Sequence, residues 1–215
     1  MRLDKFLSEA KVASRRELRT IIRAGRVQVD GITAKSPEEK VDENSQAITL
    51  DGVPVRLPGT LVLMLHKPVG YEYRRMGLKP VGRLDKDTEG LLLFTNDGAL
   101  SHALTSPKHQ VEKEYFAETE APVDAADVEE FRAGITLRDG TVCLPAELIP
   151  RGTGCRVIVR EGKYHQVRRM LASRGKPVTY LRREREGSLT LGELAIGTWR
   201  LLKPEEVQLL ENKQE

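Results

Sequence analysis

The chain has 215 residues, of which 39% are hydrophobic and 31% are charged, enough apolar material for one medium-sized domain with a small domain attached. No stretch approaches the roughly 20 apolar residues of a membrane-spanning helix, and the first residues lack the apolar core of a signal peptide. Cys143 and Cys155 have no second Cys or His at metal-ligand spacing. These features predict a cytoplasmic protein whose cysteines are buried or incidental thiols, with no disulfide framework and no structural zinc.

The net charge of +3 is unevenly distributed along the chain. Residues 1–30 contain eight Lys or Arg against four Asp or Glu, and residues 151–186 contain eleven against three. Two basic regions on an otherwise acidic chain indicate a polyanionic partner that is bound by particular faces. Two solvated, salt-bridged surfaces are the alternative.

The first 52 residues show the pattern of two helices followed by two strand pairs. From Leu3, apolar residues recur at i, i+3, i+4 and i+7, as on one face of a helix. Ser14 and Glu17 form the capping-box pattern of a second helix. Alternating apolar residues then run into Asp-Gly turns at 30–31 and 51–52, which favour hairpins.

This N-terminal segment resembles an S4 RNA-binding domain, to which we assign residues 1–57. The resemblance rests on Arg2-Leu3-Asp4-Lys5-Phe6-Leu7, Ser14-Arg15-Arg16-Glu17 and Gly25-Arg26-Val27-Gln28-Val29-Asp30-Gly31. It implies that basic side chains of the two helices contact RNA phosphates, which suits the bidentate guanidinium group. The residues predicted to bind RNA here are Arg2, Lys5, Arg15, Arg16, Arg19, Arg23 and Arg26. An amphipathic helical hairpin with an ordinary basic surface is the alternative.

Residues 56–60, rich in Pro and Gly, read as a linker to a larger domain at 61–215. Its apolar runs and alternating segments predict strands at 61–65, 91–94, 113–118, 155–160, 178–182 and 189–191. Helices are expected at 123–133, 166–173 and 205–210. The predicted fold class is α+β, with a mixed, largely antiparallel sheet in this domain.

Residues 82–90, Gly-Arg-Leu-Asp-Lys-Asp-Thr-Glu-Gly, place three carboxylates at alternate positions before a predicted strand. A calcium loop fits the beginning of this pattern, but its twelfth position is Asn96 instead of a bidentate Glu. A phosphohydrolase site would use Asp85 and Asp87 as nucleophile and acid or base, but the expected apolar strand before Asp85 is absent. A polar turn is the plain alternative.

The same segment resembles the active-site motif of the pseudouridine synthases, and similarity to the ribosomal RNA branch of that family, enzymes with an S4 domain and a synthase domain, covers nearly the whole chain. Further matching motifs are Leu65-His66-Lys67-Pro68-Val69-Gly70, Thr105-Ser106-Pro107-Lys108-His109 with Glu112-Lys113-Glu114-Tyr115, and Glu161 to Met170. The resemblance implies that Asp85 is the catalytic aspartate, Tyr115 the ring that stacks on the target base, and Arg168 the basic partner of Asp85. We also expect Arg83, Lys163, Gln166 and Arg169 to contact RNA.

The reaction of this family needs a carboxylate and no metal or other cofactor, because the N1–C1′ bond of uridine is exchanged for a C5–C1′ bond. A cation within about 4 to 6 Å favours the charged form of that carboxylate, and a flat ring receives a base pulled from its stack. Asp85 attacking C1′, Asp85 adding to C6, and Asp85 removing a ribose proton remain open. His165 is interpreted as a structural residue.

The Lys163-Tyr164-His165-Gln166 sequence resembles the small-subunit enzymes, so we expect 16S rRNA, or a small-subunit assembly particle, as partner and its uridine 516 as target. A non-catalytic S4-type RNA-binding or assembly factor is the second hypothesis, and a metal-dependent phosphohydrolase the third. The family usually has a longer segment than the eleven residues between Gly70 and Gly82, which is either a true shortening or a missing loop.

Overall fold

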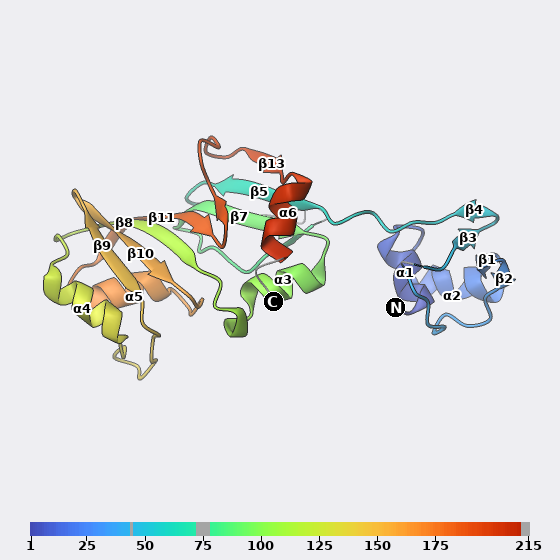
Figure 1. Ribbon diagram of the computed structural model, residues 1–215, viewed down its shortest axis with the longest axis horizontal. Helices are drawn as coiled ribbons and strands as arrows, with labels where there is room; N and C mark the ends of the chain where they lie inside the picture. The colour runs from blue at the N-terminus through green and yellow to red at the C-terminus, as the bar shows by residue number, and fades with distance from the viewer. Residues whose placement is uncertain (44, 72–77, 212–215) are drawn as a thin grey trace. The chain divides into compact units, whose positions relative to one another are not determined.

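The structure is a computed structural model that describes residues 1–43, 45–71 and 78–211 (Figure 1). The chain forms two compact units, Met1–Gly59 and Thr60–Glu215, and each contains its own clusters of buried hydrophobic residues. No helix in the described part of the chain is long and apolar enough to cross a membrane. The short segment between Gly70 and Gly82 lies largely outside the described residues, because these do not include 72–77.

The first unit begins with the two predicted helices, α1 (Leu3–Glu9) and α2 (Arg15–Arg23). The capping box is confirmed, because the Ser14 side chain accepts from the backbone N–H of Glu17 while the Glu17 carboxylate accepts from the N–H of Ser14. Such reciprocal bonds satisfy backbone donors that a helix start leaves unpaired. α2 therefore starts at a defined residue, and this fixes which side chains its exposed face presents.

Four short strands complete the first unit: β1 (Val27–Val29), β2 (Ile32–Thr33), β3 (Ile48–Leu50) and β4 (Val53–Pro54). They form an antiparallel sheet of order β2-β1-β3-β4. Both Asp-Gly turns have positive φ at both residues, the conformation that two-residue hairpins of type I′ require. Buried residues of α1 and α2 pack against those of β1 and β3 and form the core of this unit.

The second unit is built on a mixed sheet with the path β13-β5-β7-β11-β8-β10-β9. β7 and β11 are parallel, and the other recorded pairs are antiparallel. The α+β class with a largely antiparallel sheet is thus confirmed. The strands are β5 (Val62–Lys67), β6 (Lys79–Pro80), β7 (Glu89–Thr95), β8 (Lys113–Thr119), β9 (Glu147–Arg151), β10 (Gly154–Val159), β11 (Val178–Glu186), β12 (Leu189–Thr190) and β13 (Trp199–Leu201).

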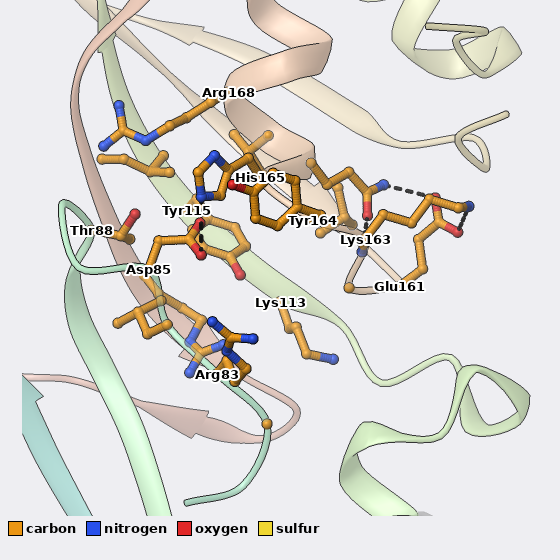
Figure 2. Close-up of a pocket in the computed structure, with 18 of the residues that line it drawn as sticks. Arg83, Asp85, Thr88, Lys113, Tyr115, Glu161, Lys163, Tyr164, His165 and Arg168 are labelled. Carbon is orange, nitrogen blue, oxygen red and sulfur yellow. Dashed lines mark hydrogen bonds and ion pairs between the residues drawn. The ribbon is translucent and has the colours of Figure 1, made fainter. Parts of the chain in front are cut away.

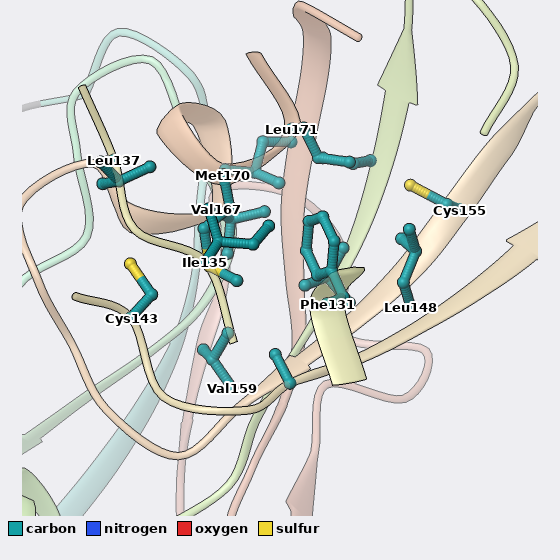
Figure 3. Packing of buried hydrophobic residues seen from close by; sticks show 14 residues of the cluster. Phe131, Ile135, Leu137, Cys143, Leu148, Cys155, Val159, Val167, Met170 and Leu171 are labelled. Atoms are coloured by element: carbon teal, nitrogen blue, oxygen red, sulfur yellow. The ribbon is translucent and has the colours of Figure 1, made fainter. Parts of the chain in front are cut away.

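The helices cover the sheet in two groups. α4 (Ala125–Ala133) and α5 (Gln166–Ser173) supply Phe131, Met170 and Leu171 to a core with β8, β9, β10 and β11 (Figure 3). α3 (Gly98–Thr105) and α6 (Pro204–Glu211) pack on each other and on a second core that includes Leu91 and Leu93 of β7. A 3₁₀ turn, η1 (Pro107–His109), follows α3.

Alternation along β7 gives its two faces different neighbours. Leu91 and Leu93 belong to the core under α3 and α6, whereas Leu92 and Phe94 pack with Leu84 and the ring of Tyr115. Leu84 of the loop at 82–90 and the predicted stacking ring of Tyr115 meet on this second face. The site is therefore expected there.

Five elements of the second unit were not predicted from the sequence: β6, α3, η1, β9 and β13. α3 lies where only a turn was expected, because Asp97 caps it by accepting from the N–H groups of Ala99 and Leu100. β9 and β13 lie at the two ends of the sheet and have mixed, partly exposed sequences without a clear period of two. Edge strands carry a weaker sequence signal for this reason.

Candidate active site

The loop that carries Asp85 is anchored on both sides by buried residues. Leu84 packs into the cluster of β5 and β7, and the backbone N–H of Thr88 donates to the carbonyl of Asp85 across a turn, at 3.1 Å. Gly90 follows in β7 with φ of 116°, and an added Cβ would lie 2.2 Å from the carbonyl oxygen of Arg183. Glycine is needed at this point because the parallel β11 backbone approaches too closely for any side chain.

Lys67 ties this loop to the end of β5. Its side chain is 1% exposed, and its ammonium group donates to the carbonyls of Pro68, Lys86 and Thr88 at 3.1, 3.1 and 2.9 Å. Burial lowers the pKa of Lys67, while nearby carboxylates, including that of Asp85, oppose this. All three donors of the ammonium are used, so this lysine holds the backbone on which Asp85 sits.

Asp85 lies on the wall of a cavity of about 390 Å³ (Figure 2). The cavity is lined from one side by the loop at 82–88, from the floor by β8 and β11, and from the other side by residues 161–168. The Asp85 carboxylate remains 29% exposed, and its Oδ1 lies 3.5 Å from Nε2 of His165. A cavity of this size with convergent polar groups is typical of a ligand site.

Tyr115 and Arg183 form a cross-strand pair on the floor of this cavity. Burial raises the pKa of the Tyr115 phenol, although the guanidinium of Arg183 opposes the shift, so the ring is neutral at physiological pH. Arg183 is 2% exposed, and its Nε donates to the carbonyl of Leu91 at 2.8 Å. Burial disfavours its charge, but attraction to Glu186, Tyr115 and Asp85 outweighs this and raises the pKa of Arg183.

Glu186 supplies the counter-charge of Arg183. Its carboxylate is fully buried and lies 3.3 Å from Nη2 of Arg183, without a hydrogen-bond donor on either oxygen. Lys113 also lines the cavity, and burial lowers the pKa of its ammonium group despite the attraction of Glu186. A buried charge is tolerated only when paired, and here the pairing holds a guanidinium beneath the cavity.

Arg168 is placed differently from the expectation. It lines the same cavity, but its guanidinium donates to the carbonyls of Asp87 and Val178 at 2.9 and 3.3 Å and pairs with the Asp87 carboxylate at 3.3 Å. Arg168 lies in the first turn of α5, from which it reaches the far end of the 82–88 loop. The ion pair expected between Arg168 and Asp85 is therefore replaced by one with Asp87.

The loop at 161–166 is held by hydrogen bonds within itself, several of them made by Gln166. Gln166 is 5% exposed. Its amide donates to Glu161 at 2.7 Å and accepts from the backbone of Lys163 at 3.0 Å. Glu161 also pairs with the Lys163 ammonium and accepts from the backbone of Leu144. Both ends of the Gln166 amide are thus bonded within the protein, so Gln166 holds this side of the cavity in place.

The other basic residues expected to bind RNA fall into two sets. Within the described chain, one set is exposed and makes no ion pair or side-chain hydrogen bond: Arg15, Arg16, Arg19, Arg23 and Arg83. The second set is paired internally: Arg2 with Asp4 and Glu38, Lys5 with Glu9, Arg26 with Asp51, and Arg169 with Asp139. The first set is free to bind phosphate without breaking a protein contact.

The three carboxylates of the motif loop do not converge. Glu89 is buried, accepts from the hydroxyl of Tyr180 at 2.9 Å and lies 3.1 Å from Nε2 of His66, while Asp87 pairs with Arg168. Among the described residues no group of three or more His, Cys, Asp or Glu is arranged to hold a metal ion. Cys143 and Cys155 are free and buried, as expected.

Sequence reasoning did not single out Lys67, Arg183 or Glu186, and it did not predict that His165 lies beside Asp85. Alternation in β11 places Arg183 on the same face as buried Leu181, a signal that was available. Nothing in the run of charged residues at 182–186 distinguishes the buried pair from its solvated neighbours, however. His165 was set aside because it precedes a helix; its left-handed backbone, with φ of 47°, turns the ring towards Asp85.

Comparisons with known proteins show the family of this chain. Residues 67–173 match the family described as RNA pseudouridylate synthase, and residues 1–47 match the S4 domain. An uncharacterised RNA pseudouridine synthase of Bacillus subtilis is 38% identical, with all of both chains covered. The ribosomal small subunit pseudouridine synthase A of Vibrio cholerae is 40% identical over 96% of this chain and 98% of its own length.

A solved structure described as a pseudouridylate synthase is 33% identical and superposes with a TM-score of 0.68, covering 98% of this chain and 99% of its own. With relatives this similar along nearly their whole length, the chain belongs to the RNA pseudouridine synthase family and carries an N-terminal S4 domain. It is an isomerase that acts on RNA. The non-catalytic and phosphohydrolase interpretations are thereby set aside.

Proposed function

We propose that this protein isomerises a uridine of small-subunit ribosomal RNA, with Asp85 as the catalytic carboxylate. The placement of Asp85 supports this most directly: it lines a cavity whose floor is formed by the partly buried Tyr115 and the buried Arg183. Several relatives along nearly the full chain carry the name ribosomal small subunit pseudouridine synthase A. Together with the Lys163-Tyr164-His165-Gln166 sequence, these names favour 16S rRNA, and uridine 516 within it, as the target.

In this proposal the uridine is turned out of its stack so that its base enters the cavity. Tyr115 presents its ring to the uracil, and the neutral phenol keeps a second negative charge away from Asp85. The Asp85 carboxylate acts as nucleophile or as base while the N1–C1′ bond breaks and C5 bonds to C1′. The hydrogen on C5 is finally lost as a proton and N1 gains one, so no electrons are exchanged with another molecule.

Two arginines have separate duties in this scheme. Arg183 provides a buried positive charge at the floor of the cavity that Asp85 lines. Arg168 fixes the far end of the same loop through the backbone and carboxylate of Asp87. Such preorganisation matters because a catalytic group displaced by about 1 Å loses much of its effect.

RNA is expected to be held by the unpaired arginines of α2, with Arg83 at the rim of the cavity. Guanidinium groups bind phosphate bidentately without fixing a sequence. The S4 domain would then supply affinity, and the cavity would select the nucleotide.

The substrate can be tested with 16S rRNA fragments and with partly assembled small-subunit particles, incubated with the protein in EDTA and mapped for pseudouridine. We expect one modified position, at uridine 516. Modification of large-subunit RNA alone, in the same assay, would overturn the proposed substrate while leaving the enzyme class intact.

A further inference from the structure

Tyr164 and His165 form a stacked aromatic pair beside Asp85. Their ring centroids are 3.9 Å apart and the ring planes differ by 15°. The pair borders two cavities, the one above Tyr115 and a second, more open one of about 590 Å³ lined by Tyr71, Arg83 and the loop at 84–87. Asp85 lines both cavities. In Figure 2 the two rings lie side by side along one side of the Asp85 carboxylate.

The pair is held in place by the protein backbone. His165 has a left-handed conformation with φ of 47°, which is unfavourable for a residue with a side chain. It is maintained because the carbonyl of Tyr164 accepts from Arg169, which is itself paired with Asp139. On the other side, the Glu161–Gln166–Lys163 contacts fix the chain that leads into the pair.

Tyr164 itself is left open to solvent. It is 70% exposed, the second highest value among the exposed large hydrophobic residues after Ile32. His165 covers one face of its ring, and its hydroxyl makes no recorded hydrogen bond with the described residues. A large flat ring, backed on one side and free on the other, is the form of a stacking platform for a nucleobase.

We propose that the outer face of Tyr164 stacks on the base of a nucleotide adjacent to the target uridine, with His165 as the backing ring. The proposal rests on the proposed function, since a uridine bound over Tyr115 must be joined to neighbours that pass the rim of the cavity. Arg83, exposed and without an ion pair among the described residues, lies at both cavities and suits the connecting phosphate. Stacking of this kind tolerates any base, because every base has a π face.

Kinetic constants for Tyr164→Phe and Tyr164→Ala separate a platform from a structural ring. With the 16S rRNA fragment that the wild type modifies, we expect the alanine variant to raise KM about tenfold or more with a smaller change in kcat. The phenylalanine variant should resemble the wild type, because the ring is retained. Trp199→Ala, which removes an exposed ring from β13 at the opposite end of the sheet path from β9, is the matched control and should leave both constants unchanged.

A second measurement reports stacking directly. The same fragment carries 2-aminopurine at the position before or after the mapped uridine, and one of the two probes should be quenched on binding to wild type and to Tyr164→Phe but not to Tyr164→Ala. Equal KM values for wild type and Tyr164→Ala, or a loss confined to kcat, would overturn the proposal. A wild-type protein that modifies no small-subunit RNA would instead overturn the substrate, so the two failures are distinguishable.

Discussion

At the scale of single residues, the floor of the cavity contains buried charged side chains, and each of them needs a partner of opposite charge. Arg183 and Glu186 are both buried, and such a pair stabilises the fold little, because desolvation of two ions offsets their attraction. Arg183 and Glu186 both line the cavity that contains Asp85 and Tyr115. A role in the site therefore explains this buried pair better than a contribution to stability does. We therefore regard Arg183 as the positioning cation of the site.

Replacement of Arg183 should test this role. Arg183→Met removes the buried positive charge, and we expect kcat to fall by about 100-fold, the usual effect of losing one preorganised electrostatic group. The matched control is Arg182→Met, since Arg182 pairs with Glu184 and is 36% exposed. Activity should change little there.

Unfolding of the Arg183→Met variant would complicate the measurement, because the buried Glu186 would lose the guanidinium with which it pairs. The double variant Arg183→Met with Glu186→Met restores neutrality. A folded double variant with wild-type turnover would show that the pair has no part in the reaction.

Lys67 supports the backbone of the loop that carries Asp85. Lys67→Met leaves three carbonyl groups without their donor, and we expect the free energy of unfolding to fall by roughly 1 to 3 kcal/mol. Urea denaturation measures this loss, and kcat should fall with it because Asp85 loses its support. Lys108→Met, at an exposed lysine of η1, should alter neither quantity.

At the scale of elements, the sequence predicted the strands and helices with strong periodicity and missed those defined by their neighbours. α2 and α5 were predicted at their observed starts, since a capping box and an apolar stripe mark them. β13 was missed because its three residues form a strand only by pairing with β5. Its position depends in turn on α6, through a bidentate contact between Arg200 and Glu206 at 2.7 Å for both bonds.

This contact predicts a pH dependence of stability. The hydrogen bonds from Arg200 lower the pKa of Glu206 from 4.5 to about 2. A carboxyl group with a depressed pKa in the folded state contributes stability above its unfolded pKa, and the contribution is lost as the pH falls towards the folded value. Glu206→Gln should therefore be less stable than wild type at pH 7, with a difference that shrinks between pH 4.5 and pH 2.

Thermal unfolding of both proteins across that range measures the effect. Glu205→Gln, at the exposed neighbouring position, serves as the control and should follow the wild type. A difference between Glu206→Gln and wild type that stays constant from pH 7 to pH 2 would rule out the carboxylate as its source.

At the scale of the whole molecule, the S4 domain and the synthase domain have separate hydrophobic cores. The N-terminal cluster contains residues of 1–57 alone, and the clusters of the second unit contain none of them. The sequence predicted this division through the change from S4-like to synthase-like motifs. The sequence did not predict which arginines lack an ion pair. Arg26 is paired because the fold brings it beside Asp51, which is 25 residues away in the chain.

Removal of residues 1–59 should leave a folded second unit that binds RNA weakly. Four unpaired arginines of α2 would be lost, and each phosphate contact contributes roughly 0.7 to 0.9 to the slope of log affinity against log salt concentration. We expect the slope to shrink by roughly 3. Equal affinity and equal slope for the two proteins, measured on the same rRNA fragment, would contradict the role of the S4 domain.

Asp85 is the residue on which the proposed reaction depends most, since that reaction needs one ionised carboxylate that a neutral amide of the same shape cannot replace. Pseudouridine formation in a 16S rRNA fragment should be abolished in Asp85→Asn, with folding and RNA binding nearly intact because this half-buried side chain adds little to the core. Asp87→Asn, which weakens only the contact with Arg168, should retain measurable turnover. Pseudouridine formed at the normal rate by Asp85→Asn would contradict the assignment of the catalytic carboxylate.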